Sequence, residues 1–224
     1  PAVLSRGTVR HPDMESLSAA MDTLYGATVD SIVRKKGERQ CIGFAAGFID
    51  DAYTPHGEKL LEPVAELLGE MLLEPVTRNG SFLAEYVDSE KANLIDAIRS
   101  LRNDKRDWAD IRLMQEMCAA EPYSVLRLGD EASAAALDAE TLYRHERALL
   151  ASSRVEVLYC GSAEEQRVED AVRAALSVLP RSKVTPLAPI RQYAAPAQPR
   201  VVTETMDVNQ GKLALGYRCA TEDM

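Results

Sequence analysis

The side chains that could bind a metal or act as acids and bases lie far apart in this sequence. The three histidines, His11, His56 and His145, lack the i, i+4 spacing that directs two imidazoles at one ion. Ser152 and Ser162 have no histidine nearby in a recognisable nucleophile arrangement, so serine chemistry is unsupported. Neither a GxGxxG run nor a Walker loop is present, which also argues against nucleotide binding.

Charged side chains gather in one segment, where acids are followed at helical distances by bases. The acids are Glu85, Asp88, Glu90 and Asp96, and the bases are Lys91, Arg99, Arg102 and Lys105. Acids and bases three or four residues apart on a helix pair with one another in solvent. The pattern therefore favours an ion-paired helix face, with a cation site as the alternative.

Composition restricts the class of protein. The 224 residues are 46% hydrophobic, which is enough for a sizeable core, and carry a net charge of −9, which disfavours nucleic acid and anionic membranes as partners. The cysteines form no CxxC pair and stand at Cys41, Cys118, Cys160 and Cys219. Isolated thiols are typical of a reducing compartment, so we expect a cytoplasmic protein. No apolar run approaches the length of a membrane span.

The periodicity of apolar residues predicts an α+β fold in which an antiparallel sheet packs against helices. Helical spacing occurs in 13–25, 57–73, 81–118 with a break near Asn103-Asp104, 131–150, and 163–179. Alternation predicts antiparallel strands at 28–35 and 40–49, joined by a turn at 36–39. A buried strand is also predicted at Val155 to Cys160. The order of elements is mixed and does not form a regular βαβ series.

Proline content marks a boundary near the end of the chain. Residues 180–199 contain five of the eleven prolines, a composition typical of an extended linker. Beyond it, 201–206 and 213–217 alternate like two strands. We therefore predict a domain at 1–187, a linker at 188–200 and the first strands of a second domain at 201–224. Because the chain opens at Pro1 without an initiator Met, we expect a piece of a longer protein.

Three ordered segments carry a resemblance to a known family. They are Arg6-Gly7-Thr8 with a helix ending Leu24-Tyr25-Gly26-Ala27; Phe82 with Glu85, Glu90-Lys91 and Asp96-Ala97-Ile98; and Leu142-Tyr143 with a segment ending Cys160-Gly161. In this order and spacing, residues 1–187 resemble the N-terminal half of the insulinase/pitrilysin metallopeptidases, which include mitochondrial processing peptidase. The resemblance implies a processing-peptidase-like α+β domain and a second, similar half.

The resemblance also implies where a zinc site would lie. Active members carry an HxxEH motif just before the Gly-Thr pair and a third ligand seven residues after the glutamate matched by Glu90. Here the motif's glutamate falls on Pro1, its second histidine on Ala2, and the third ligand on Ala97. A hydrolytic zinc needs three protein ligands and a water. We therefore predict no catalytic residue and no zinc ligand in this chain, although zinc serves active relatives.

Peptide binding does not depend on the metal. Family members clamp extended substrates against an edge strand, and main-chain pairing needs no particular side chain. The resemblance places this strand at 28–33, with Val29, Asp30, Ser31 and Ile32 as the predicted contacts. Active members carry an Asn-Ala-aromatic-Thr pattern there, which this chain lacks. The alternative is that 28–33 is an ordinary strand of the sheet.

A bacterial branch, in which a silent, HxxEH-lacking protein is paired with an active-looking one, is resembled by Asn103-Asp104-Lys105, Trp108-Ala109 and the stretch from Met117-Cys118 to Glu121-Pro122-Tyr123. Trp108, Met114 and Met117 share one helical face and are predicted to be core, with a partner surface as the alternative. The leading hypothesis is a non-catalytic half of a clamshell chamber that holds peptide or an active partner in a hetero-oligomer. Its rivals are a zinc endopeptidase, completed by a paired HxxEH-bearing subunit or by residues before Pro1, and a purely structural protein.

Overall fold

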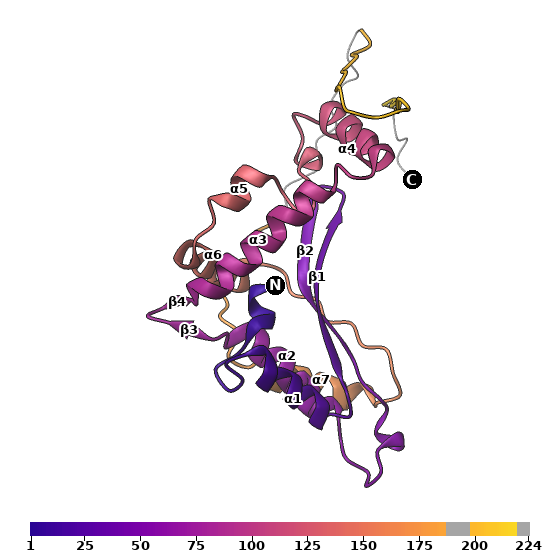
Figure 1. The fold of residues 1–224 in the computed structure, drawn as a ribbon. Coiled ribbons are helices and arrows are strands. Elements are labelled where there is room, and N and C mark those ends of the chain that lie inside the picture. The colour runs from indigo at the N-terminus through magenta and orange to yellow at the C-terminus, as the bar shows by residue number, and fades with distance from the viewer. Residues whose placement is uncertain (187–197, 219–224) are drawn as a thin grey trace.

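The computed structural model of the chain describes residues 1–186 and 198–218 and has an α+β fold (Figure 1). The helices are α1 (Met14–Thr23), α2 (Leu61–Leu73), α3 (Ala84–Ser100), α4 (Lys105–Met117), α5 (Glu131–Ala135), α6 (Ala139–Ser152) and α7 (Glu165–Ala175). The short 3-10 turns are η1 (Val3–Arg6), η2 (Asp51–Tyr53) and η3 (Pro122–Ser124). The strands are β1 (Thr28–Lys36), β2 (Arg39–Gly47), β3 (Thr77–Arg78) and β4 (Ser81–Phe82).

A long antiparallel hairpin forms the spine of the molecule. Strands β1 and β2 pair from Thr28 opposite Gly47 to Lys36 opposite Arg39, so the predicted hairpin is confirmed. Its two-residue turn contains Gly37 at φ 60, a left-handed conformation that glycine adopts without a steric penalty. In Figure 1 the hairpin runs from the layer of α1, α2 and α7 to the region of α4.

Helix α2 is the centre of the main apolar layer. Leu67 and Met71 of α2 form a buried cluster with Leu17 of α1, and Val29 and Phe44 of the hairpin pack against it. The hairpin therefore covers these two helices with one face. On its other side α2 lies against α7, where a Cβ on Gly69 would come within 2.5 Å of the Ala175 carbonyl oxygen. Only glycine permits this close approach of the two helices.

A second apolar cluster joins the start of the chain to α3 and α6. Leu4, Phe82 and Val87 are buried together, and Tyr143 of α6 packs against them. The rings of Phe82 and Tyr143 meet edge to face with centroids 5.2 Å apart. Edge-to-face contact is a favoured arrangement of aromatic pairs. These contacts fix η1 beside α3, where the site discussed below lies.

The predicted helix break near Asn103-Asp104 is confirmed. Asp104 caps α4 by accepting hydrogen bonds from the backbone N–H groups of Arg106 and Asp107. The prediction that the apolar residues of α4 are core is wrong, because α4 has no buried residue. Trp108 instead donates its indole N–H to Glu204 at 3.2 Å.

Segments predicted as strands elsewhere do not form strands. Val155 to Cys160 was predicted as a buried strand, but it carries no ladder pairing in the described residues, and Leu158 is 92% exposed. Residues 201–206 and 213–217 are likewise unpaired within that part of the chain. A strand needs a hydrogen-bonded neighbour for its backbone, and in the described residues the sheets contain only β1 with β2 and β3 with β4. The predicted linker 188–200 lies mostly outside the described residues.

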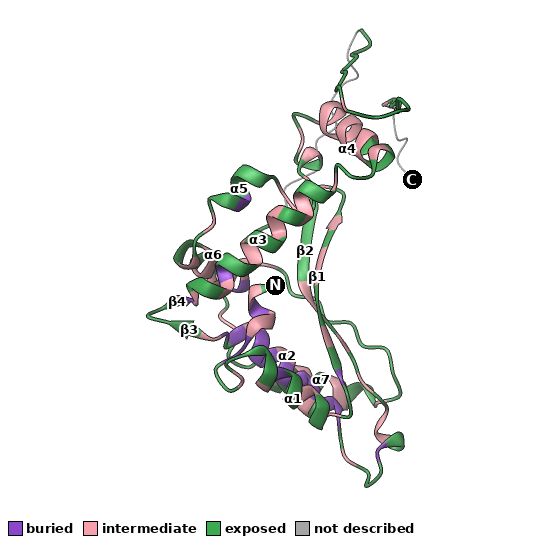
Figure 2. Ribbon diagram, viewed as in Figure 1, coloured by how far each residue is buried: buried purple, intermediate pink, exposed green. Residues whose placement is uncertain are grey.

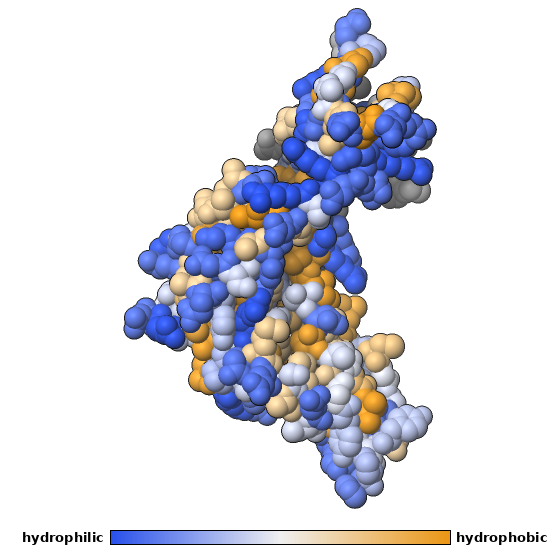
Figure 3. Space-filling model, viewed as in Figure 1, coloured by the Kyte–Doolittle hydropathy of each residue, from blue (hydrophilic) through white to orange (hydrophobic). Residues whose placement is uncertain are grey.

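Burial is concentrated in one part of the molecule. Figure 2 shows buried residues mainly in and around α2, whereas α4 and the hairpin are half-buried or exposed. In Figure 3 hydrophilic side chains dominate the visible face around α3 and α4, and apolar side chains appear in the middle, beside the hairpin. No helix among the described residues is long and apolar enough to cross a membrane.

Candidate functional site

The region where the resemblance places the metal lies between η1 and α3. Arg6, at the end of η1, reaches across to α3, and its Nε lies 2.6 Å from Glu90 Oε1. Its Nη2 also contacts that oxygen and donates to Ser89 Oγ at 3.2 Å. Both partners of the ion pair are mostly shielded from solvent. The guanidinium therefore supplies the positive charge that balances Glu90.

The side chains at the predicted ligand positions do not fit zinc. Ala2 is exposed immediately before η1, and Ala97 is half-exposed on α3. An alanine side chain has no lone pair to donate, and a hydrolytic zinc requires three protein ligands. Among the described residues there is no group of three His, Cys, Asp or Glu side chains placed to hold a metal ion. Glu90 is paired with Arg6, so the donor set for zinc is not assembled.

Glu146 of α6 is a second carboxyl group with an unusual environment. Both of its carboxylate oxygens are buried, and no hydrogen-bond partner among the described residues contacts either. Burial raises the pKa of Glu146 to about 7, and the nearby charge of Arg147 opposes the rise. A raised pKa of this kind is common in functional sites, but by itself it does not identify one.

The Gly7-Thr8 pair is held by a buried polar network. Thr8 is fully buried, and its Oγ1 donates to Glu70 Oε1 and accepts from the His11 backbone N–H at 3.0 Å. The Arg10 backbone N–H also donates to Glu70, at 3.2 Å. At Gly7 a Cβ would lie 2.6 Å from the Pro12 backbone, so a larger residue would displace the loop. The pair therefore has a structural role here: it fixes the loop onto α2.

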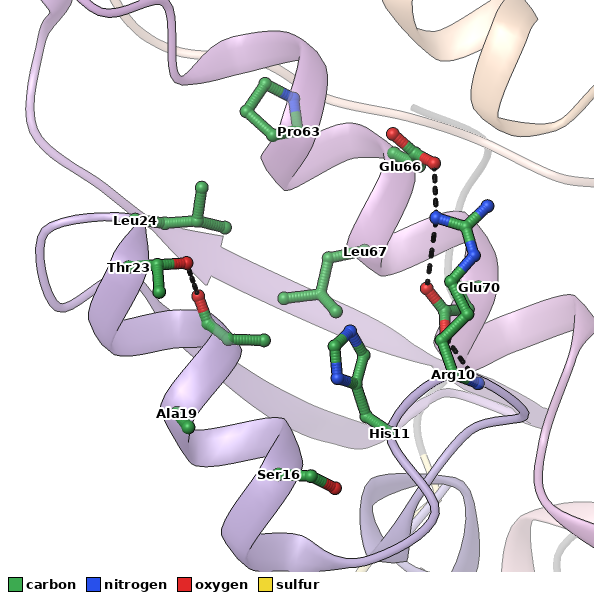
Figure 4. A pocket seen from close by; sticks show the side chains of 11 residues that line it. Arg10, His11, Ser16, Ala19, Thr23, Leu24, Pro63, Glu66, Leu67 and Glu70 are labelled. Atoms are coloured by element: carbon green, nitrogen blue, oxygen red, sulfur yellow. Dashed lines mark hydrogen bonds and ion pairs between the residues drawn. The ribbon is translucent and has the colours of Figure 1, made fainter.

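A pocket of about 460 Å³ lies beside this loop, between α1 and α2 (Figure 4). Arg10 crosses its edge, with Nη1 2.6 Å from Glu66 and 3.9 Å from Glu70. His11 also lines the pocket. The two acids are already paired with Arg10, so the pocket contains no free acid and base facing one another. Its geometry does not support catalysis.

The predicted peptide-binding residues lie on β1. Val29 packs against the core cluster, Ile32 is half-buried, and Asp30 and Ser31 are exposed. Among the described residues, no backbone hydrogen bond joins β1 or β2 to any segment outside the hairpin. Each strand of the hairpin thus has one edge of unpaired N–H and C=O groups, which is a template for pairing with another chain. The structure brings the four predicted residues together on one such strand.

Glu70 and the contact between Arg6 and Glu90 were not predicted from the sequence. Glu70 is the single acid between Leu67 and Leu73, in an otherwise apolar run of α2. An acid in such a run is rarely buried unless it is paired, so it could have been predicted to have a partner. The Arg6–Glu90 pair joins residues far apart in the sequence, and no local pattern indicates it.

The chain matches one known family over its C-terminal part and known proteins over most of its length. Residues 136–223 match the family described as "Peptidase M16 inactive domain". Among curated proteins, the chain is 32% identical over 220 residues to "Probable inactive metalloprotease YmfF" from Bacillus subtilis (strain 168). This match covers 97% of the chain and 51% of the relative. The chain thus spans about half the length of the curated relative it matches.

Solved structures share the fold. A conserved protein from Enterococcus faecalis V583 superposes with a TM-score of 0.74 at 24% identity, over 86% of this chain and 46% of that one. A peptidase M16 inactive domain from Pseudomonas fluorescens superposes with a TM-score of 0.65 at 17% identity. That match covers 87% of this chain and 44% of the other. The predicted α+β fold and the predicted resemblance to this metallopeptidase family are confirmed.

Proposed function

We propose that this chain is a non-catalytic member of the peptidase M16 family, to which it is similar, and that it binds extended peptide segments along the edge of β1. The observation that carries the proposal is the unpaired edge of the hairpin. An extended peptide can add a strand to such an edge through main-chain hydrogen bonds alone. This mode of binding needs no metal, and it fits a chain with alanines at two expected ligand positions.

The hairpin is suited to this role because it is already held in place. One face packs on α1 and α2 through Val29 and Phe44, so the strand direction is fixed before a peptide arrives. A preorganised strand loses less conformational entropy on binding than a flexible one. The bound segment would come from a peptide, a substrate protein or a paired, HxxEH-bearing peptidase subunit.

Hydrogen exchange tests the proposal directly. The protein is incubated with an extended, β-prone peptide of nine residues, the length of β1, and exchange of backbone amides is followed by mass spectrometry. We expect slower exchange at 28–36, because outward-facing amides of β1 become hydrogen-bonded. A peptide of the same sequence with alternate amides N-methylated is the control, because it cannot complete the ladder.

Each outcome has a clear meaning. Protection of β1 by the unmodified peptide and not by its N-methylated form supports strand addition. Protection confined to β2 moves the binding site to the other edge of the hairpin and contradicts the assignment of residues 29–32. Equal exchange with and without peptide, at concentrations that saturate binding, contradicts the proposal.

A further inference from the structure

The tip of the hairpin carries a cluster of positive charges on one face. Lys36 and Arg39 lie directly opposite each other across the two strands, and Arg34 is paired with Cys41 one step further along the same face. Residues i and i+2 of a strand share a face, so Arg34, Lys36 and Arg39 point to the same side. All three are exposed. We call these three residues the tip cations.

The opposite face of the tip is occupied. Lys35 donates from Nζ to the carbonyls of Pro122 and Tyr123 at 3.1 and 2.7 Å, and also contacts the carbonyl of Val125. Gln40, its cross-strand partner, donates to the Arg127 carbonyl at 2.9 Å. The loop around η3 thus holds the tip by one face, which leaves the tip cations on the other.

The tip cations lack an acidic partner among the residues that the structure describes. None of them forms an ion pair within residues 1–186 and 198–218, although most arginines in that part of the chain do. Glu38 in the turn is the acid nearest in sequence, and it is not within ion-pair distance of them. Like charges directly opposite on a sheet destabilise it. This arrangement stands out in a chain whose net charge is −9.

We propose that the segment that pairs with β1 is acidic, with carboxylates that lie beside Arg34 and Lys36 of β1 and are also attracted by Arg39 on β2. The inference rests on the proposed function and names its substrate class. An added strand runs alongside β1 at about 4.8 Å, so its side chains on the shared face come next to Arg34 and Lys36. Cross-strand pairs of opposite charge stabilise a sheet, and they also fix the register of the added strand.

Two peptides of nine residues, the length of β1, test the inference. One carries glutamates at alternate positions near one end, and the other has glutamines in their place. Binding is measured by fluorescence anisotropy at low and at physiological salt. At low salt we expect the glutamate peptide to bind about tenfold more tightly than the glutamine peptide. The ratio of the two affinities should be smaller at physiological salt, because salt screens exposed charges.

Matched protein variants assign the effect to the tip cations. The variant R34Q/K36Q/R39Q is compared with R144Q/R154Q/R173Q, which removes three exposed arginines of α6, α7 and the intervening segment and changes the net charge equally. We expect the first variant to lose the preference for glutamate and the second to keep it. Circular dichroism confirms that both remain folded.

Three results would overturn the inference. If both peptides bind equally and protect 28–36 in hydrogen exchange, strand addition stands but the partner is not selected by charge. If heparin binds at the tip cations as tightly as the acidic peptide and β1 is not protected, the tip is a general polyanion site. If neither peptide binds, the proposed function and the inference both fail.

Discussion

Two helices of equal length show how differently the parts of this protein are held together. Helices α2 and α4 each contain 13 residues, yet α2 has eight buried residues and α4 has none. The sequence of α2 is apolar apart from Glu62, Glu66 and Glu70, whereas α4 alternates apolar and charged residues. The protein therefore has one layer that is stabilised by apolar burial and another that is held mainly by polar contacts.

The polar contacts of α4 include ion pairs with the segment that follows the Pro-rich stretch. Arg112 lies 3.3 Å from Glu204, and Arg200 lies 2.6 Å from Glu116. Ion pairs with exposed partners contribute little to stability, because solvent screens them and long side chains lose entropy. We therefore expect the α2 layer to dominate the free energy of unfolding and the α4 layer to open locally at lower cost.

Truncation of a methionine in each helix is expected to give the largest contrast. Met71 is 1% exposed, so Met71→Ala leaves a cavity and should lower the free energy of unfolding by about 2–5 kcal/mol. Met114 on α4 is half-buried, and Met114→Ala should lower the free energy of unfolding by less than about 1 kcal/mol. Urea denaturation measures both. Equal losses would show that α4 is as much a part of the core as α2.

The network around Thr8 should give the next largest effect. Thr8→Val keeps the shape but leaves Glu70 and the His11 N–H without their shared partner, which should destabilise the protein by about 1–3 kcal/mol. Thr23→Val is the control, because the Thr23 hydroxyl is exposed and bonds only the Ala20 carbonyl. Thermal unfolding of the two variants checks the difference. A Thr8 variant as stable as the control would mean that the network contributes nothing.

Glu146 should make stability depend on pH. Burial raises its pKa to about 7 in the folded protein, above the ordinary value of 4.5, so folding favours the protonated form. The contribution of protonated Glu146 to the free energy of unfolding is fully present below about pH 4.5 and is lost as the pH rises to about 7. The stability of the Glu146→Gln variant relative to wild type should therefore be higher at pH 8 than at pH 5.

The control for Glu146 lies on the same helix. Glu140 is exposed on α6, so Glu140→Gln should leave the wild-type pH dependence in place. Unfolding midpoints in denaturant at several pH values compare the variants. A wild-type profile unchanged by Glu146→Gln between pH 5 and pH 8 would contradict the raised pKa.

The smallest expected effect is the coupling between Arg6 and Glu90. A double-mutant cycle with Arg6→Met and Glu90→Gln should give a coupling energy of about 0.5–1 kcal/mol, because about a fifth of each side chain is still exposed to solvent. The exposed pair of Arg144 and Glu140 is the matched control and should show almost no coupling. Coupling near zero for Arg6 and Glu90 would mean that the ion pair does not balance the charge of that glutamate.

Local features of this fold could be predicted from the sequence. The hairpin follows from alternating residues around a Gly-containing turn, and the break between α3 and α4 follows from the capping ability of Asp104. Such features depend on neighbours in the sequence, which a single chain displays.

Features that depend on distant neighbours could not be predicted. Val155 to Cys160 has the composition of a buried strand, but its state depends on whether another strand lies beside it. The apolar spacing of α4 predicted burial that the fold does not provide. Similarly, the ion pair of Arg6 with Glu90 and the bond of Thr8 to Glu70 arise only when separate segments meet. At the candidate site, the resemblance indicated the positions of Arg6, Glu90 and Ala97, but it predicted neither their contacts nor Glu70.

The most direct test of the central claim is the zinc content of the protein, expressed with any residues encoded before Pro1. The protein and its Glu90→Ala variant are loaded with zinc, desalted and measured by elemental mass spectrometry, with a chelator-controlled peptidase assay alongside. A non-catalytic peptide-binding member predicts near-zero zinc in both and no metal-dependent hydrolysis. A tightly held zinc that is lost with Glu90, together with peptidase activity that the chelator abolishes, would contradict it.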